Sequence, residues 1–358
     1  MIFNRKKKEA LEAQRDSSEG AIANKEVEGK SQRQIVLGRF IRHRGAMISV
    51  FILVSLIIIV YSALDFKLGP WKVKGWWKYS ISDIPEGAFA PCPHGEIGCP
   101  TMSLNPFSKT FGLGEHPFGQ DDIGRDYLAL VMRGAQRSIL VMFIIGAIGG
   151  TLGTIMGSIS GFYRGKVDAI LMRFTDFIIT IPSIIIGSVV GYHYGNLGVP
   201  FLAMYLGLFA WTGLSRLVRG EFLKLRELEF VDAARVAGAS NRRIIFKHIL
   251  PNAVGIIIVS VTLLMSGAIL LETALSYIGF GVVAPDVSLG LLISQYQDSF
   301  TSRPWLFWYP GFFIVSIALS VNFIGDGLRD AFDPRQRRRI SKKDRQRASD
   351  IAKERESL

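Results

Sequence analysis

Residues 138–163 read SILVMFIIGAIGGTLGTIMGSISGFY and contain no charged side chain. A helix rises about 1.5 Å per residue, so about 20 apolar residues cross the hydrocarbon core of a bilayer. Other uncharged runs cover residues 45–64, 177–215, 249–271 and 304–325. So many long uncharged runs would be unusual in the core of a water-soluble protein, and the chain is therefore predicted to cross a membrane several times.

The run at 177–215 is too long for a single span, and the Gly-rich stretch Gly191–Gly198 is expected to divide it. Six spans are then predicted, near residues 46–64, 138–162, 169–191, 199–214, 252–273 and 305–325. The predicted fold class is an all-α polytopic membrane protein with six transmembrane helices.

The chain is strongly basic, with 42 Lys and Arg against 30 Asp and Glu. Residues 1–44 and 329–358 hold 11 Lys and Arg each, and residues 216–247 hold eight, whereas residues 192–198 hold none. This alternation is the positive-inside pattern, which predicts both termini in the cytoplasm and argues against nucleic-acid binding. Residues 65–137 also hold eight Lys and Arg, but this segment exceeds 60 residues and long loops largely escape the rule.

The spans divide the chain into five parts. A cytoplasmic N-terminal tail (1–45) leads into the first transmembrane helix (46–64), which is expected to act as an uncleaved anchor because the polar start contains no signal peptide. An extracytoplasmic insert with an outer amphipathic segment covers 65–137. A five-helix core (138–330) follows, with a cytoplasmic loop at 220–251, and a basic cytoplasmic tail (331–358) completes the chain. The predicted location is the cytoplasmic (inner) cell membrane, with several passes through the bilayer.

The two cysteines, Cys92 and Cys99, both fall in the insert. Outside the cytoplasm a disulfide is the expected state, and closing so short a loop would contribute about 2.5 kcal/mol in the chain-entropy model. Free thiols remain an alternative. A metal site using Cys92, His94 and Cys99 is another, but it lacks a fourth ligand, so no metal is predicted.

Residues 226–251 read RELEFVDAARVAGASNRRIIFKHILP and lie in the predicted cytoplasmic loop. Residues 222–237 favour a helix, and Gly238 can adopt the left-handed conformation that ends one. Ser240 can then cap a second short helix, which Pro251 bounds. We call residues 226–251 the elbow. Its Ala233 and Ala234 are expected to present a flat surface that docks into a partner protein and passes rigid-body motion to the attached spans.

The elbow resembles the "EAA" loop of binding-protein-dependent ABC importer permeases. That pattern is Glu-Ala-Ala, three residues, Gly, nine residues, then Ile-x-Leu-Pro. This chain has Asp232 in place of Glu and His248 in place of Ile, with the same spacing. The resemblance implies that an ATPase subunit contacts the elbow. The residues assigned to this coupling are Glu229, Asp232, Ala233, Ala234, Gly238, Leu250 and Pro251.

A second pattern precedes the second span and is similar to the outer motif of the dipeptide/oligopeptide/nickel branch of that family. Its residues, which we call the outer motif, are Asp121, Gly124, Arg125, Asp126 and Arg137. Gln120 stands where that branch usually has Thr. The resemblance covers residues 118–335 and is closest to a "C"-type permease with a type I ABC importer fold. It implies import of peptides or a related small solute.

The resemblance also implies partners. These are a second permease subunit in a heterodimer, two cytoplasmic ATPase subunits and an extracytoplasmic solute-binding protein, all arranged around the lipid bilayer. No cofactor is expected. The chain carries no phosphate-binding Gly-x-x-x-x-Gly-Lys-Ser/Thr loop, so it is not predicted to be an enzyme and ATP hydrolysis is assigned to the partner ATPases.

Two alternatives to this function are an ion-coupled secondary transporter and a membrane enzyme. A secondary transporter would more often show inverted repeats and acidic residues at mid-membrane, and an intramembrane protease would need paired catalytic groups there. Glu272 is the acidic side chain best placed near a span, because it follows 23 uncharged residues. Ionisable groups in spans are costly. Glu272 is therefore a candidate for the transport pathway or a gate, and a structural pairing is the other interpretation.

Overall fold

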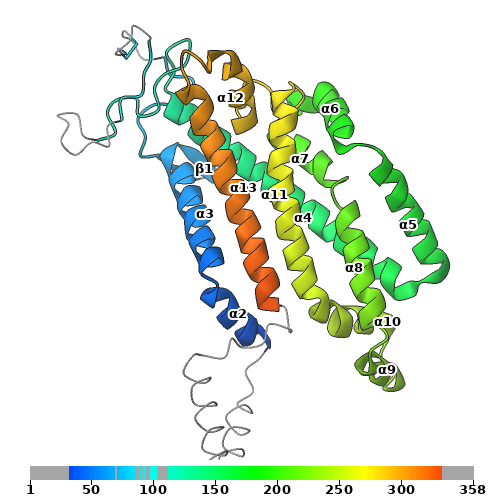
Figure 1. Ribbon diagram of the computed structural model, residues 1–358. Coiled ribbons are helices and arrows are strands. Elements are labelled where there is room, and N and C mark those ends of the chain that lie inside the picture. Colours follow the sequence, from blue (N-terminus) through cyan, green and yellow to red (C-terminus); the bar gives the residue numbers. More distant parts are fainter. Residues whose placement is uncertain are drawn as a thin grey trace, which may run out of the picture.

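The computed structural model describes residues 32–68, 71–84, 89–90, 92, 97–102 and 112–332. Most of these residues are helical, and the long helices lie side by side in one bundle (Figure 1). The predictions for residues 1–31 and 333–358 of the two tails lie outside the described residues.

The bundle has two ends, which Figure 1 shows at the top and the bottom. The insert end carries β1, β2 and α12, and the elbow end carries α2, α9 and α10. The longer helices are α2 (Gln32–Arg42), α3 (Arg44–Ala63), α4 (Tyr127–Tyr163), α5 (Gly165–Thr180), α6 (Ser183–Tyr194), α7 (Val199–Gly207), α8 (Thr212–Leu225), α11 (Leu250–Tyr277) and α13 (Trp305–Phe332). The shorter elements are β1 (Phe66–Leu68), β2 (Trp71–Val73), α9 (Glu229–Val236), α10 (Asn241–Arg243) and α12 (Leu289–Tyr296).

Five helical stretches in the described residues are long and apolar enough to cross a membrane: Arg44–Ala63, Tyr127–Tyr163, Val199–Leu225, Asn241–Tyr277 and Trp305–Phe332. A sixth span is formed if α5 and α6 are counted together. The predicted helical polytopic fold is therefore confirmed. The antiparallel β1–β2 hairpin in the insert is a small addition to it.

The third predicted span, near 169–191, is not one straight helix. Its two halves, α5 and α6, meet at 73°. Proline has no backbone N–H and disfavours helical conformation in the residue before it, and Pro182 lies at this joint after the extended Ile181. The span therefore breaks where the sequence places its proline.

The second span begins earlier than predicted. Asp126 caps α4, so the helix runs unbroken from Tyr127 and includes the segment that the sequence assigned to the insert. Further along α4, glycines face α8 closely: a Cβ added at Gly153 would lie 2.8 Å from Leu214 Cβ, and one at Gly157 would collide with the Ser215 carbonyl oxygen. The small face of α4 thus packs against α8 within the same chain.

Buried apolar side chains form three clusters that position the two ends. One joins α3, α4, α11, α12 and α13 toward the insert end. A second joins the elbow to the end of α8 and includes Phe222, Val231 and Ile249. The third fills the space between α4, α6, α7 and α11.

Candidate functional site

The elbow projects from its end of the bundle between α8 and α11 (Figure 1). Its short helix α9 is held by two side chains, because Val231 is 0% exposed and Ala234 is 8% exposed against the cluster that contains Phe222. Glu229, Asp232 and Ala233 lie on the exposed face of the same helix. The prediction that Ala233 and Ala234 share a docking surface is therefore wrong for Ala234, which faces inward.

Gly238 ends α9 as the sequence predicts. Its φ is +77°, and nothing lies within 4 Å of an added Cβ. The Gly238 N–H donates to the Arg235 carbonyl at 2.9 Å and the Ala239 N–H donates to the Ala234 carbonyl at 3.0 Å, which is the Schellman pattern. Ser240 then caps the next helix, and its Oγ accepts the Arg243 N–H at 3.4 Å.

The second short helix that Pro251 was expected to bound does not exist as a separate element. Residues Asn241–Tyr277 form one continuous helical run, because α10 passes through a π-helical stretch at Ile244–Ile249 into α11. The wider π turn, in which the Leu250 N–H reaches the Ile245 carbonyl, accommodates Pro251 without a break. Leu250 and Pro251 therefore lie inside a long helix and not at a joint.

The predicted helix over 222–237 is also interrupted. α8 ends at Leu225 and α9 begins at Glu229, so the bend lies at Arg226–Leu228. Arg226 Nη1 donates to the Phe162 carbonyl, and Glu227 Oε1 pairs with Arg164 at 2.6 Å. Burial, with the nearby charges of Arg164 and Arg235, lowers the pKa of Arg226. These contacts fasten the bend to the end of α4.

The elbow exposes apolar side chains that the sequence pattern did not single out. Val236 is 90% exposed, Phe246 is 60% exposed and Phe230 is 36% exposed. Phe246 also lines an open hollow of about 370 Å³ with Ser240, Arg242 and Arg243. The helical periodicity of α9 could have indicated that Val236 is exposed. A residue five positions after the buried Val231 points away from the helix face on which Val231 lies.

Asp121, Gly124 and Asp126 of the outer motif are buried, in contrast to most of the elbow. Asp121 is 1% exposed, and its carboxylate accepts from the Arg125 backbone N–H at 2.8 Å, from Arg125 Nε at 2.6 Å and from the Tyr296 hydroxyl at 3.2 Å. Gly124 has φ +88°, which allows the tight turn. Burial and the charge of Asp121 raise the pKa of Tyr296 well above its usual value, so its hydroxyl remains a donor.

Asp126 is 0% exposed and starts α4. Its Oδ1 accepts the Ala129 N–H at 2.8 Å and Trp77 Nε1 at 2.9 Å, while its Oδ2 lies 2.8 Å from His116 Nδ1. Trp77 and His116 come from the insert, and the sequence analysis did not connect them with the motif. Only their long-range bonds to Asp126 reveal them.

Arg137 does not join the other members of the outer motif. It lies in the third turn of α4, where its Nη2 pairs with Asp286 Oδ1 at 2.9 Å. Asp286 precedes α12, so this ion pair ties α4 to the segment between α11 and α12.

Glu272 lies on α11 and is 0% exposed. Its Oε1 accepts the Ser276 hydroxyl at 2.7 Å and its Oε2 accepts the Ser138 hydroxyl at 3.0 Å. In the part of the chain that the structure describes, no ion pair includes Glu272. Its carboxyl group is therefore held by hydroxyl groups.

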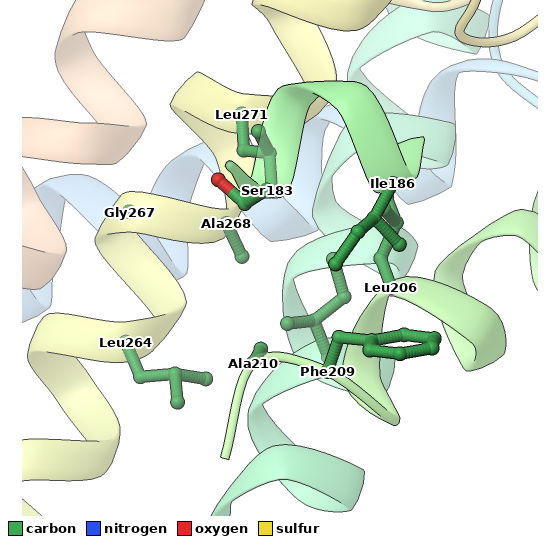
Figure 2. Close-up of a pocket in the computed structure, with 10 residues that line it drawn as sticks. Ser183, Ile186, Leu206, Phe209, Ala210, Leu264, Gly267, Ala268 and Leu271 are labelled. Atoms are coloured by element: carbon green, nitrogen blue, oxygen red, sulfur yellow. The ribbon is translucent and has the colours of Figure 1, made fainter. Parts of the chain in front are cut away.

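A small apolar pocket of about 190 Å³ lies near this region (Figure 2). Ser183 and Ile186 of α6 line one side of it, Leu206 and Phe209 another, and Leu271 belongs to the α11 wall. Ser183 carries the hydroxyl among the labelled side chains and lies directly after the break at Pro182.

In the insert, the structure joins Cys92 and Cys99 in a disulfide with Cα atoms 5.4 Å apart. His94, the third member of the metal alternative, lies outside the described residues. Among the residues described, no group of three or more His, Cys, Asp or Glu side chains is arranged to hold a metal ion.

The bundle, with its projecting elbow, is that of a helical polytopic membrane protein. Residues 149–338, just over half of the chain, match the family described as "Binding-protein-dependent transport system inner membrane component". The chain belongs to this family.

Two relatives named as oligopeptide permeases agree with this assignment. The chain is 36% identical to the oligopeptide transport system permease protein OppC of Mycobacterium tuberculosis over 87% of this chain and 97% of that protein. It is 37% identical to the OppC protein of Haemophilus influenzae, over 88% of this chain and 93% of that protein. An inward-facing MetNI methionine ABC transporter structure is 19% identical, with a TM-score of 0.49, over 57% of this chain and 96% of that chain.

The chain is therefore a multi-pass inner-membrane permease, the transmembrane component of a binding-protein-dependent ABC importer. Residues 149–338 include the elbow and Glu272, and the outer motif lies just before them.

Proposed function

We propose that this permease imports peptides and is driven by two separate ATPase subunits that dock on the elbow. It pairs with a second permease in a heterodimer and receives its solute from an extracytoplasmic binding protein. Both termini and the elbow lie in the cytoplasm, as the distribution of Lys and Arg favours. The peptide assignment rests on the names of the oligopeptide permeases that this chain resembles.

One observation carries the proposed coupling: the elbow exposes apolar side chains that this chain does not cover. Val236 of α9 is 90% exposed, and Phe246, near the start of the helical run Asn241–Tyr277, is 60% exposed. Exposed apolar groups that cluster on one surface mark a protein interface. The acidic Glu229 and Asp232 flank this surface, and Asp232 already pairs with Arg235 at 3.0 Å.

The mechanism we assign to the elbow is a rigid-body transfer of motion. α9 is fastened to the α8–α11 cluster by Val231 and Ala234, and the following helix runs without a break to Tyr277. A displacement of α9 by the ATPase pair would therefore move α8 and α11 and not be absorbed in a flexible loop. Alternation of this displacement with ATP binding and hydrolysis would open the path to each side in turn.

The third span supports the proposal of a second permease. Only Thr175 and Ile178 of α5 are buried, while Ile170 and Phe177 are 69% and 64% exposed. Figure 1 shows α5 at the edge of the bundle. Irregular backbone at membrane depth is tolerated where it is buried in protein or lines a cavity, so the break at Pro182 favours a protein neighbour or the transport path on this side.

The test compares two glycine substitutions in the assembled complex. An added methyl group finds nothing within 4 Å at either Gly238 or Gly220, but only Gly238 has a positive φ. Gly238→Pro cannot adopt φ +77° and also removes the N–H that ends α9. We expect Gly238→Pro to abolish coupled uptake, Gly238→Ala to reduce it, and Gly220→Ala to leave it unchanged.

The measurements are uptake and ATP hydrolysis by purified complexes in liposomes. Uptake that stays coupled to hydrolysis at the wild-type level in Gly238→Pro would contradict the coupling role. Uptake by the permease pair without ATPases, driven by an ion gradient, would favour the alternative of a secondary transporter.

A further inference from the structure

The hydroxyl network around Glu272 extends beyond the two serines that touch its carboxyl group. The Ser276 oxygen also accepts the Val282 N–H at 3.1 Å and the Ser288 hydroxyl at 3.2 Å. The Ser138 oxygen accepts the Leu289 N–H at 3.4 Å. The network therefore holds α4, α11 and the segment 278–289 together around one carboxyl group.

Counting hydrogens explains why a carboxyl group stands at the centre. A serine hydroxyl has one hydrogen to donate and two lone pairs with which it accepts. Ser276 accepts two hydrogens from the segment 278–289 and Ser138 accepts one, and the hydrogen of each hydroxyl is donated to the residue at 272. Glu272 supplies the two acceptor oxygens that this arrangement requires.

The same segment is held at two other points. Asp286 pairs with Arg137 of α4 at 2.9 Å, and Ser288 caps α12 by accepting the Leu291 N–H at 3.2 Å. At the far end of α12, Tyr296 donates to Asp121 of the outer motif. We call residues 278–296 the outer segment. It is thus joined to α4 through Asp286, to the outer motif through Tyr296, and to α11 through Ser276, whose hydroxyl Glu272 accepts.

α11 links this network to the elbow. The helical run Asn241–Tyr277 has 37 residues and is therefore about 55 Å long. It begins directly after Ser240 of the elbow and contains Glu272 in its last two turns. One uninterrupted rod thus connects the proposed ATPase-docking surface with the outer segment.

From this geometry we infer that Glu272 is a positioning residue: it holds the hydroxyls of Ser276 and Ser138, which bond the outer segment, so that movement of α11 is delivered to that segment. Hydrogen bonds that centre on the carboxyl group hold the outer ends of α4 and α11 and the outer segment together as one rigid unit. A displacement of the elbow is then transmitted through α11 to the surface where the binding protein is expected to dock. Docking of the binding protein acts on the elbow through the same helix. This inference rests on the proposed coupling of the elbow to ATPase subunits.

The experiment measures ATP hydrolysis by the complete importer in lipid nanodiscs, with and without peptide-loaded binding protein. The variants are Glu272→Ala, Glu272→Gln and Ser276→Ala. Ser266→Ala is the matched control, because Ser266 is a buried hydroxyl of the same helix, 2% exposed, that donates to the Ala318 carbonyl at 3.1 Å and not to the outer segment. Hydrogen exchange of residues 278–289 reports whether the network has loosened.

We expect Glu272→Ala to retain basal hydrolysis and to lose stimulation by the binding protein about tenfold, as when about 1.4 kcal/mol of coupling is lost. Ser276→Ala should lose stimulation at least as strongly, because it removes the bonds to Glu272, Val282 and Ser288 together. Glu272→Gln should be intermediate, because its amide oxygen can accept from Ser276 but its nitrogen leaves the Ser138 hydrogen without an acceptor. Ser266→Ala should be stimulated like the wild type.

The inference is overturned if residues 278–289 exchange faster in Glu272→Ala while stimulation and uptake per complex equal those of Ser266→Ala. It is also overturned if Glu272→Gln, which removes one bond, and Ser276→Ala, which removes three, assemble and remain fully stimulated. A wild-type complex that contains no ATPase or is not stimulated by a binding protein would instead contradict the proposed function, and this is measured before any variant.

Discussion

The outer motif and the elbow lie at opposite ends of the same bundle and differ in how their polar groups are satisfied. Asp121 and Asp126 of the outer motif are 1% and 0% exposed, and bonds within the chain occupy their carboxylates. Asp232 of the elbow has a side chain that is 65% exposed, and Val236 beside it is 90% exposed. The polar groups of the first region are satisfied within this chain, whereas the second leaves an acidic and an apolar side chain exposed.

The two motifs are therefore expected to have different roles. The outer motif sets where α4 begins and how α12 is held, so its residues act on the stability of this chain. The elbow is shaped by a few buried residues, and most of its other side chains are exposed, where we propose that the ATPase subunits dock. Substitutions should therefore reduce stability at the insert end and reduce assembly or coupling at the elbow end.

The largest effect on stability is expected from Asp126→Ala. It removes the N-cap of α4 and leaves Trp77 and His116 without their acceptor, which together should lower stability by about 3–5 kcal/mol. The measurement is thermal unfolding of the purified chain in detergent. Asp122→Ala is the control, because Asp122 has a 54% exposed side chain and pairs with Arg303, and it should cost at most about 1 kcal/mol. Equal melting temperatures for the two variants would contradict the buried role of Asp126.

The next prediction separates the two faces of α9. Ala234→Glu would bury a charge beside Val231 and should unfold the elbow locally, at a cost of several kcal/mol. Val236→Glu adds the same charge at a position that is 90% exposed, so stability should change by less than about 0.5 kcal/mol. Binding of the ATPase subunits should nevertheless weaken by at least about tenfold in Val236→Glu. If Val236→Glu bound the ATPases normally, Val236 would not belong to the docking surface.

A third prediction concerns the disulfide of the insert. Without prior reduction, neither Cys92 nor Cys99 should react with an alkylating reagent, because the two sulfurs are bonded to each other. Replacing both with Ser should lower stability by about 2.5 kcal/mol or less, and ATPase binding at the elbow should not change. Mass spectrometry of alkylated protein measures the first result. Full alkylation of both thiols in the unreduced protein would show that the bond is absent.

The smallest effect is a pH dependence at the insert. Hydrogen bonds from Tyr79 and Lys78 lower the pKa of Glu115 below its ordinary value of 4.5. The ionised Glu115 carboxylate therefore stabilises the folded protein at pH values above the pKa that Glu115 has in the unfolded chain. This stabilisation is lost as the pH falls through the lower pKa that Glu115 has in the folded chain. The difference in melting temperature between the wild type and Glu115→Gln should persist from pH 7 to about 5 and shrink below 4.5. A difference that grew as the pH fell would have the wrong sign.

Much of the fold could be predicted from local patterns. Long uncharged runs indicated the spans, and Gly238 and Ser240 indicated the end of α9 and the cap after it. These features follow from the cost of leaving backbone groups unpaired in lipid and from conformations that few residues adopt. Both depend on residues close in sequence.

The errors arose where distant contacts override local preference. Pro251 reads as a helix boundary, but packing of Ile244 and Ile249 into the cluster beneath α9 keeps the helix continuous through a π turn. From the sequence, Ala234 was predicted to be part of a docking surface. In the structure it faces inward, because it is buried against the same cluster. A local pattern does not show which face of a short helix the rest of the chain will cover.

The amino-acid order alone was enough to establish a helical membrane protein with an elbow of the permease type, because apolar length and turn residues act over a few neighbouring positions. The partners of buried polar groups required the folded chain. Asp126 meets Trp77 across 49 residues, and Glu272 meets Ser138 across 134. The physical reason is that a hydrogen bond depends on atoms brought within about 3 Å, and for residues so far apart in sequence only the packing of the folded chain sets that distance.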